Sequence, residues 1–151
     1  MVKRGRLPKY VFDTNLVISK EYDPLNLPER TYASSIVLFE LITACNDMNE
    51  RRAYEQTWRD SKKQGVLIIP SEADWLAASK ISFTLAQERK QQAGGKAPRL
   101  TSKVKQEIAM DCLLAVSAAR EGVIVLTLNR HDFDYIKRHC KNLMVQEYPK
   151  L

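Results

Sequence analysis

Cysteine and histidine are scarce in this chain, whose 151 residues include three cysteines and two histidines. Cys45, Cys112 and Cys140 are odd in number, have no paired short spacing and lie among apolar neighbours. This pattern predicts small core side chains in a reducing compartment. It suggests neither a disulfide framework nor a zinc site built from clustered Cys or His.

Long apolar runs are also missing. No segment is long and apolar enough to span a membrane, and the basic residues 1–6 are not followed by an apolar segment of signal-peptide length. We therefore expect a cytoplasmic protein without membrane contact. A length of 151 residues fits one core, so residues 1–151 are predicted to form a single domain.

Acidic residues are absent from one stretch of the second half. Residues 1–75 hold 11 Lys and Arg against 11 Asp and Glu, whereas residues 76–151 hold 13 against 7. Residues 89–106 contain six basic residues and no acid. A basic run is usually a solvated surface, yet a patch of one sign attracts polyanions, and nucleic acid is the common one.

Short β-rich runs alternate with helical segments along the chain. Strands are predicted at residues 9–12, 66–70, 123–127 and 143–145, and helices at 16–20, 35–45, 46–64, 72–92, 103–120 and 132–138. Because helices separate all the strands, the strands should pair in parallel through right-handed crossovers. The predicted fold is a three-layer α/β domain with a central, mainly parallel sheet flanked by helices.

Local details of three helices can also be predicted. Thr31 or Ser34 should cap the helix at 35–45, and Asp132 should cap the helix at 132–138. On the helix at 72–92, the side chains expected to face inward are Trp75, Leu76, Ser79, Phe83 and Ala86.

Two carboxylates stand in the middle of helical segments that are otherwise apolar. Glu40 lies within residues 35–45 and Asp111 within residues 108–116, and neither has a Lys or Arg four residues before or after it. An unpaired buried charge costs several kcal/mol, so each acid needs a cation, hydrogen bonds or a proton. For either acid alone, a salt bridge to a distant Lys or Arg remains an alternative.

Two further acids follow predicted strands. Asp13 ends the first strand and Asp132 lies just beyond the third, so neighbouring parallel strands would bring both to one edge of the sheet. Asp13 alone would serve equally well as a helix N-cap. If Glu40 and Asp111 approach the same edge, each pair of charges repels by about 3 kcal/mol at ~5 Å and an effective dielectric of ~20. A divalent ion would remove this repulsion, and oxygen-only ligands favour Mg²⁺ or Mn²⁺ over zinc.

The same segments resemble the PIN-domain ribonucleases, and most closely the VapC toxins of prokaryotic toxin–antitoxin pairs. The resemblance covers most of the chain in the right order. It rests on Asp13-Thr14-Asn15, on Ser35 with Glu40-Leu41, on residues 111–119, and on residues 126–129 with Asp132-Phe133.

The resemblance implies a Mg²⁺- or Mn²⁺-dependent endoribonuclease that hydrolyses RNA phosphodiester bonds as the toxin of a type II toxin–antitoxin system. The implied catalytic and metal-binding residues are Asp13, Glu40, Asp111 and Asp132, and the implied supporting residues are Asn15, Thr127 and Asn129. The implied partners are an RNA of unknown class, with tRNA as one candidate, a cognate VapB-like antitoxin, and a second copy of the chain in a homodimer.

The basic stretch supplies candidates for contacts with RNA phosphates, which set affinity without reading a sequence. These candidates are Lys96, Arg99, Lys103 and Lys105. Two acids remain ambiguous. Asp134 lies two residues from Asp132, about 200° away on a helix, so only one of the two can easily enter the site. Glu107 precedes Asp111 by one helical turn and is a supporting candidate.

Two other functions stay open. One is a non-catalytic RNA-binding or regulatory PIN-like module that works through its basic patch. The other is a phosphatase with the Asp-x-Asp strand end, which is disfavoured because residue 15 is Asn. His131 is expected at the surface, and the Trp and Tyr side chains are expected to pack rather than to stack on bases.

Overall fold

The chain is described by a computed structural model that covers residues 6–23, 25–28, 30–92, 94 and 100–148. The elements follow in the order β1 (Tyr10–Phe12), α1 (Thr14–Ser19), β2 (Thr31–Ser34), α2 (Ser35–Ala44), α3 (Met48–Lys63), β3 (Leu67–Ile68), α4 (Glu72–Gln92), α5 (Ser102–Arg120), β4 (Ile124–Thr127), α6 (Arg130–Lys137) and β5 (Met144–Glu147). All the predicted elements are present, with ends shifted by a few residues. Among the described helices, none combines the length and apolar character needed to cross a membrane.

The strands form one sheet in the order β3-β2-β1-β4-β5, and every neighbouring pair is parallel. The predicted α/β class, with a parallel central sheet flanked by helices, is confirmed. Strand β2 was not predicted, because the sequence Thr-Tyr-Ala-Ser at residues 31–34 lacks a continuous apolar run and three of its residues are only half-buried. Pairing with β1 on one side and β3 on the other makes this segment a strand.

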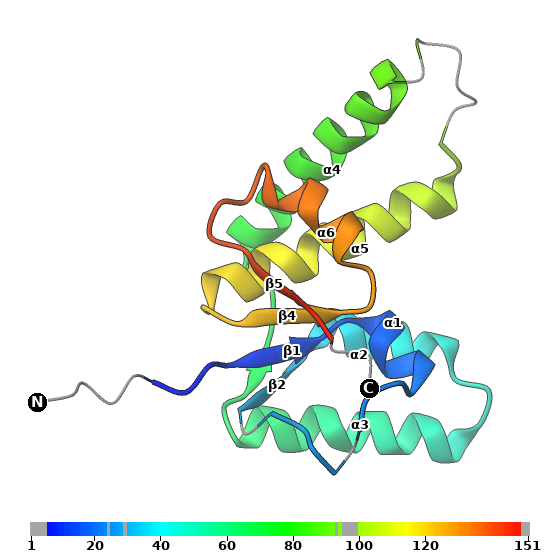
Figure 1. The fold of residues 1–151 in the computed structure, drawn as a ribbon. Coiled ribbons are helices and arrows are strands. Elements are labelled where there is room, and N and C mark those ends of the chain that lie inside the picture. Colours follow the sequence, from blue (N-terminus) through cyan, green and yellow to red (C-terminus); the bar gives the residue numbers. More distant parts are fainter. Residues whose placement is uncertain (1–5, 24, 29, 93, 95–99, 149–151) are drawn as a thin grey trace, which may run out of the picture.

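The chain reverses its direction across the sheet between β3 and β4. From β1 it moves outward through β2 to β3, returns to the other side of β1 as β4, and continues to β5. Since crossovers between parallel strands are right-handed, the reversal puts α1–α3 and α4–α6 on opposite faces, and Figure 1 shows the two groups of helices apart. Strands β1 and β4 therefore meet at the switch point, where open α/β sheets place ligands beyond the carboxyl ends.

Helix α4 buries a different face from the predicted one. The buried residues are Asp74, Ala78, Ile81 and Leu85, spaced four, three and four residues apart. Of the side chains predicted to face inward, Trp75, Leu76, Ser79 and Phe83 are exposed and Ala86 is half-buried. The small side chain of Ala78 permits close packing of α4, and Asp74 pairs with Arg120 of α5. Together with Ile81 and Leu85, these two residues form the face of the helix that is buried.

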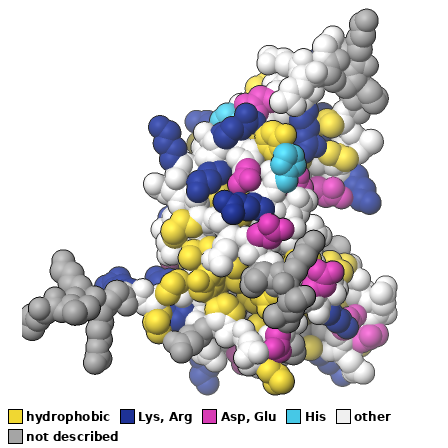
Figure 2. Space-filling view, viewed as in Figure 1, with side chains coloured by type: hydrophobic (Ala, Val, Ile, Leu, Met, Phe, Trp, Pro, Cys, Tyr) yellow, Lys and Arg dark blue, Asp and Glu magenta, His cyan; other side chains and the backbone are white. Residues whose placement is uncertain are grey.

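The surface distributes its side chains unevenly. Figure 2 shows charged and histidine side chains interspersed where Figure 1 places α4–α6, and hydrophobic side chains gathered near β1 and β2. The apolar helix α2 is also not wholly covered, because Phe39 is 58% exposed.

The predicted helix caps are partly confirmed. The Ser34 hydroxyl caps α2 by accepting a hydrogen bond from the amide of Ile36 at 3.2 Å. The prediction for Asp132 is wrong, since α6 begins two residues earlier, with Asn129 at the N-cap position, and Asp132 lies in its first turn.

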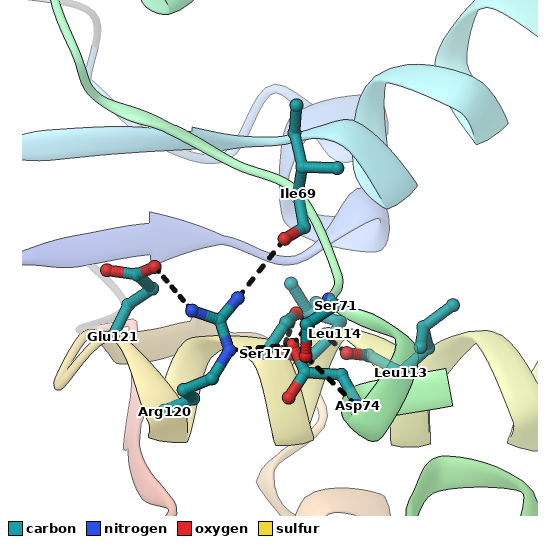
Figure 3. A network of polar contacts seen from close by, with 8 residues as sticks. All are labelled: Ile69, Ser71, Asp74, Leu113, Leu114, Ser117, Arg120 and Glu121. Carbon is teal, nitrogen blue, oxygen red and sulfur yellow. Dashed lines mark hydrogen bonds and ion pairs between the residues drawn. The ribbon is translucent and has the colours of Figure 1, made fainter. Parts of the chain in front are cut away.

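An ion pair between a buried aspartate and a more exposed arginine joins the start of α4 to the end of α5 (Figure 3). Asp74 is 3% exposed, and its Oδ2 accepts hydrogen bonds from Nε of Arg120 at 2.8 Å and from the amide of Ser71 at 2.9 Å. The guanidinium also donates to the carbonyl of Ile69 and to the carboxylate of Glu121. Burial raises the pKa of Asp74, but these hydrogen bonds outweigh burial and lower it overall.

Replacing the cation of this pair should destabilise the fold. In Arg120→Ala, Asp74 would remain buried without its partner, and we expect the free energy of unfolding to fall by about 2 kcal/mol in urea denaturation. Arg51→Ala is the matched control, because Arg51 pairs with Glu55 on the exposed surface of α3 and should contribute at most about 0.5 kcal/mol. Equal losses in both variants would contradict this assignment.

Candidate active site

A cleft of about 580 Å³ opens at the carboxyl ends of β1 and β4 and brings the four predicted acids together. Its acidic lining residues are Asp13, Glu40, Glu88, Glu107, Asp111 and Asp132. They come from the end of β1 and from α2, α4, α5 and α6. Acids up to 119 residues apart in sequence therefore share one cavity, while their catalytic and metal-binding roles stay predictions.

Asp13 lies at the centre of this arrangement and is 3% exposed. Its Oδ1 accepts a hydrogen bond from the amide of Thr14 at 2.8 Å, and its Oδ2 accepts one from the hydroxyl of Thr127 at 3.0 Å. Asp13 is therefore the N-cap of α1 and a lining residue of the cleft at once. Burial raises its pKa against the effect of both hydrogen bonds, and the nearby charge of Asp132 adds to the rise.

Thr127 connects the two central strand ends. It is fully buried at the end of β4, and its hydroxyl donates to Asp13 and accepts from the amide of Asn129 at 2.9 Å. The side-chain amide of Asn129 in turn donates to Oδ2 of Asp132 at 2.6 Å. Thr127 and Asn129, two of the predicted supporting residues, therefore hold Asp13 and Asp132 by hydrogen bonds without lining the cleft themselves. The third, Asn15, lines the cleft.

The two acids from apolar helices are held differently. Glu40 accepts a hydrogen bond from the Thr14 hydroxyl at 3.0 Å, whereas Asp111 makes no hydrogen bond or ion pair with any described residue. Burial, followed by the charges of Asp13 and Glu40, raises the pKa of Asp111 to about 8. Burial also raises the pKa of Glu40, against the Thr14 hydrogen bond and with the charges of Asp13 and Glu107.

The structure separates the two acids of α6 that the sequence left ambiguous. Asp132 lines the cleft, whereas Asp134 is exposed and lies 3.7 Å from Nε of Arg130. Glu107 also lines the cleft, and its charge raises the pKa of both Glu40 and Asp111.

The predicted basic contacts do not line the cleft. Lys103 and Lys105 are exposed at the start of α5, and Lys96 and Arg99 lie outside the described residues. Among the lining residues that the structure describes, Arg89 of α4 is the one Lys or Arg. Arg89 belongs to the basic run noted in the sequence, but nothing in the sequence distinguished it from its neighbours.

Two aromatic residues of α6 that the sequence assigned elsewhere also line the cleft. These are His131, expected to be merely at the surface, and Tyr135, expected to pack. The adjacency of His131 to Asp132 was the one available signal.

The donor set suits a divalent cation that prefers oxygen. Carboxylates outnumber the basic lining residue, and the described lining includes no cysteine. Within the described part of the chain, however, no three acidic, His or Cys side chains are already arranged around one point as a metal site. Binding an ion would therefore require some of these carboxylates to come closer together.

Comparison of the structure with known proteins identifies the fold. The chain is similar to a chain of DNA-bound VapBC from Salmonella typhimurium, with 18% identity, a TM-score of 0.52, and coverage of 93% of this chain and 98% of that one. The chain has the fold of the VapBC structures. No protein-family model matches the sequence, and neither does any curated protein.

Two other solved structures give the same result. VapBC2 from Rickettsia felis, bound to a DNA fragment from its promoter, matches with 19% identity, a TM-score of 0.51, and coverage of 93% and 98% of the two chains. FitAB bound to the IR36 DNA fragment matches with 14% identity, a TM-score of 0.52, and coverage of 91% and 94%. The likeness to VapC-type toxins predicted from the residues is confirmed at the level of the fold.

The raised pKa of Asp111 predicts how the stability of the protein depends on pH. Between the ordinary value of 3.8 and about 8, the folded state keeps a proton that the unfolded state has released. With divalent ions chelated, this carboxyl therefore makes the free energy of unfolding fall as the pH rises from about 4 to about 8, by several kcal/mol.

Asp111→Asn, which cannot ionise, should flatten this fall when urea denaturation curves are compared between about pH 5 and about pH 9. Asp134→Asn, which removes an exposed acid of α6, should keep the wild-type slope. Parallel slopes for wild type and Asp111→Asn would contradict the assignment.

Proposed function

We propose that this protein is a metal-dependent endoribonuclease. The observation that carries the proposal is that one cleft brings together Asp13, Glu40, Asp111 and Asp132. Among the described residues that line this cleft, Arg89 is the one Lys or Arg. The raised pKa values of three of these acids indicate that this arrangement is electrostatically unfavourable without a cation. Acids with perturbed pKa values that share a cleft are typical of functional sites, which supports a role for this cluster in binding a ligand.

Mg²⁺ or Mn²⁺ would be held by these four carboxylates. Asp13 and Glu40 each keep acceptor capacity beyond their present hydrogen bonds, and Asp111 is free of such bonds to described residues. When bound, the ion would lower the pKa of a coordinated water and stabilise the charge that develops on the phosphate during in-line attack.

The chain's own residues would orient the reacting groups. The hydroxyl of Thr127 fixes the rotation of Asp13, and Asn129 fixes that of Asp132. The hydroxyl of Thr14 sets the position of Glu40. Arg89 would hold a phosphate of the RNA on the α4 side of the cleft, and Lys103 and Lys105 would attract the strand at longer range.

The partner of the protein is proposed from the same fold. Two of the similar structures are VapBC complexes by name, and the motifs of this chain resemble those of VapC toxins. We propose that this chain is the toxin of a type II pair and that a VapB-like antitoxin covers its cleft. Ile18 lines the cleft at 56% exposure, and Phe39 is exposed next to Glu40, so the rim offers apolar contacts to a protein. A homodimer in the cytoplasm and a tRNA substrate belong to the same proposal.

A non-catalytic RNA-binding or regulatory module is the second candidate. One observation favours it, namely that no metal site is already formed among the described residues. The two candidates differ in whether RNA is cleaved when Mg²⁺ or Mn²⁺ is added.

Cleavage of RNA tests the proposal directly. With Mn²⁺ present, the wild type is expected to cut an RNA pool that includes tRNA, and chelation of the ion is expected to abolish cutting. Asp111→Asn should lower the rate at least about a hundredfold, because a lost ligand removes several kcal/mol of transition-state stabilisation. Asp134→Asn should retain wild-type cleavage. Cleavage that persists unchanged in Asp111→Asn would refute the assignment.

Thermal unfolding tests ion binding without relying on activity. At about a hundredfold excess over its dissociation constant, a bound ion adds about 2.7 kcal/mol, which raises the melting temperature by about 5–10 °C in a protein of this size. Mn²⁺ should produce this shift in the wild type and in Asp134→Asn, and a much smaller one in Asp111→Asn. Equal shifts in all three proteins would place the ion elsewhere.

A further inference from the structure

Helix α6 contributes more than an acid to the cleft. His131, Asp132 and Tyr135 line the cavity, and Phe133 and Ile136 anchor the helix in the core. His131 and Tyr135 are four residues apart, so their side chains lie one above the other on the same face of the helix. The acidic centre therefore has a pair of rings directly beside it on the same short helix.

The geometry of the two rings leaves a flat surface available. Their centroids are 4.9 Å apart with an interplanar angle of 78°, which is an edge-to-face contact. The guanidinium of Arg138 lies 4.9 Å from the centroid of the Tyr135 ring. Tyr135 is thus held by contacts with two neighbours. An edge-to-face contact covers at most one face of the histidine ring, so at least one face of His131 is left uncovered by Tyr135.

The two histidines of the chain differ in what they contact. The Nε2 atom of His139 lies 2.9 Å from Oε1 of Glu88, which also pairs with Arg138. His131 is exposed to the cleft and makes no hydrogen bond or ion pair with any residue that the structure describes. His139 therefore has a structural role, whereas His131 is positioned by its ring contact alone.

We propose that the face of the His131 ring is a stacking surface for a nucleobase of the bound RNA. This inference rests on the proposed function and adds the side chain that receives a base next to the reacting phosphate. A nucleotide held at the acids must direct its base away from the charged centre. The imidazole next to Asp132, supported by Tyr135, offers that base a flat partner.

Stacking would bind single-stranded RNA without selecting one base, because every base has a π-face. Carboxylates repel the phosphate backbone unless a cation lies between them, so the acids alone do not attract RNA. A stacking surface would add an attractive contact to a base, which gives the aromatic pair a function beside the acids. A stacking role for His131 can be distinguished from a proton-transfer role, because stacking needs an aromatic ring and not an ionisable nitrogen.

Steady-state kinetics on a short single-stranded oligoribonucleotide with Mn²⁺ tests the proposal. His131→Ala is expected to raise KM about tenfold, the size that loss of one stacked base produces, with kcat nearly unchanged. His131→Phe keeps a ring and should stay near the wild-type KM. Asp134→Asn is the control, because it changes an exposed residue of the same helix that does not line the cleft, and it should retain wild-type kinetics.

A binding measurement separates this inference from the proposed function. In an Asp111→Asn background, fluorescence anisotropy would compare an oligoribonucleotide with an abasic ribose-phosphate chain of the same length. The protein with His131 should bind the base-containing strand about tenfold more tightly than the abasic strand, and His131→Ala should lose this preference.

Equal affinity for both strands in both proteins would overturn the stacking surface. A KM that rises equally in His131→Ala and His131→Phe would also overturn it, because the imidazole nitrogens would then be required. If the wild type cleaves no RNA while the base preference depends on His131, the proposed function fails and the stacking surface stands.

Discussion

The hydrogen bond from Thr127 to Asp13 lies at the point of the sheet where the cleft forms. It joins the carboxyl ends of β1 and β4, the two neighbouring strands at the switch point of the sheet. Because right-handed crossovers send α1–α3 and α4–α6 to opposite faces, helices from both layers converge at this one edge. Glu40 arrives from one layer and Asp111 from the other, and the topology of the sheet accounts for their meeting.

Two carboxylates removed from solvent, Asp74 and Asp111, have opposite electrostatic surroundings. Asp74 is paired with Arg120 and with the amide of Ser71, and its pKa is lowered. Asp111 has burial and like charges around it, and its pKa is raised to about 8. The first arrangement stabilises the packing of α4 on α5. The second opposes the folded state, and it lies with the other acids of the cleft at the carboxyl ends of β1 and β4.

Sequence patterns predicted what depended on local chemistry and on the order of elements. The acids were found because Glu40 and Asp111 interrupt apolar helices, and the parallel sheet followed from the alternation of strands and helices. Strand β2 was missed because its four residues become a strand only through pairing with two neighbours. The exposed face of α4 was misjudged because Trp75 and Phe83 are large and apolar, whereas the face that packs combines Ile81 and Leu85 with a small residue and an acid paired to Arg120. His131 was assigned to the bulk surface because a sequence does not show which helix faces meet at a cavity.

Asp13 combines two tasks in a single side chain, since one carboxylate oxygen caps α1 and the other is held toward the cleft by Thr127. Asparagine caps helices about as well as aspartate but carries no charge. The substitution Asp13→Asn would therefore remove one negative charge from the cleft while keeping a good cap at the start of α1. Comparing the two side chains in a binding measurement would therefore separate the effect of the charge at the strand end from the effect of the cap.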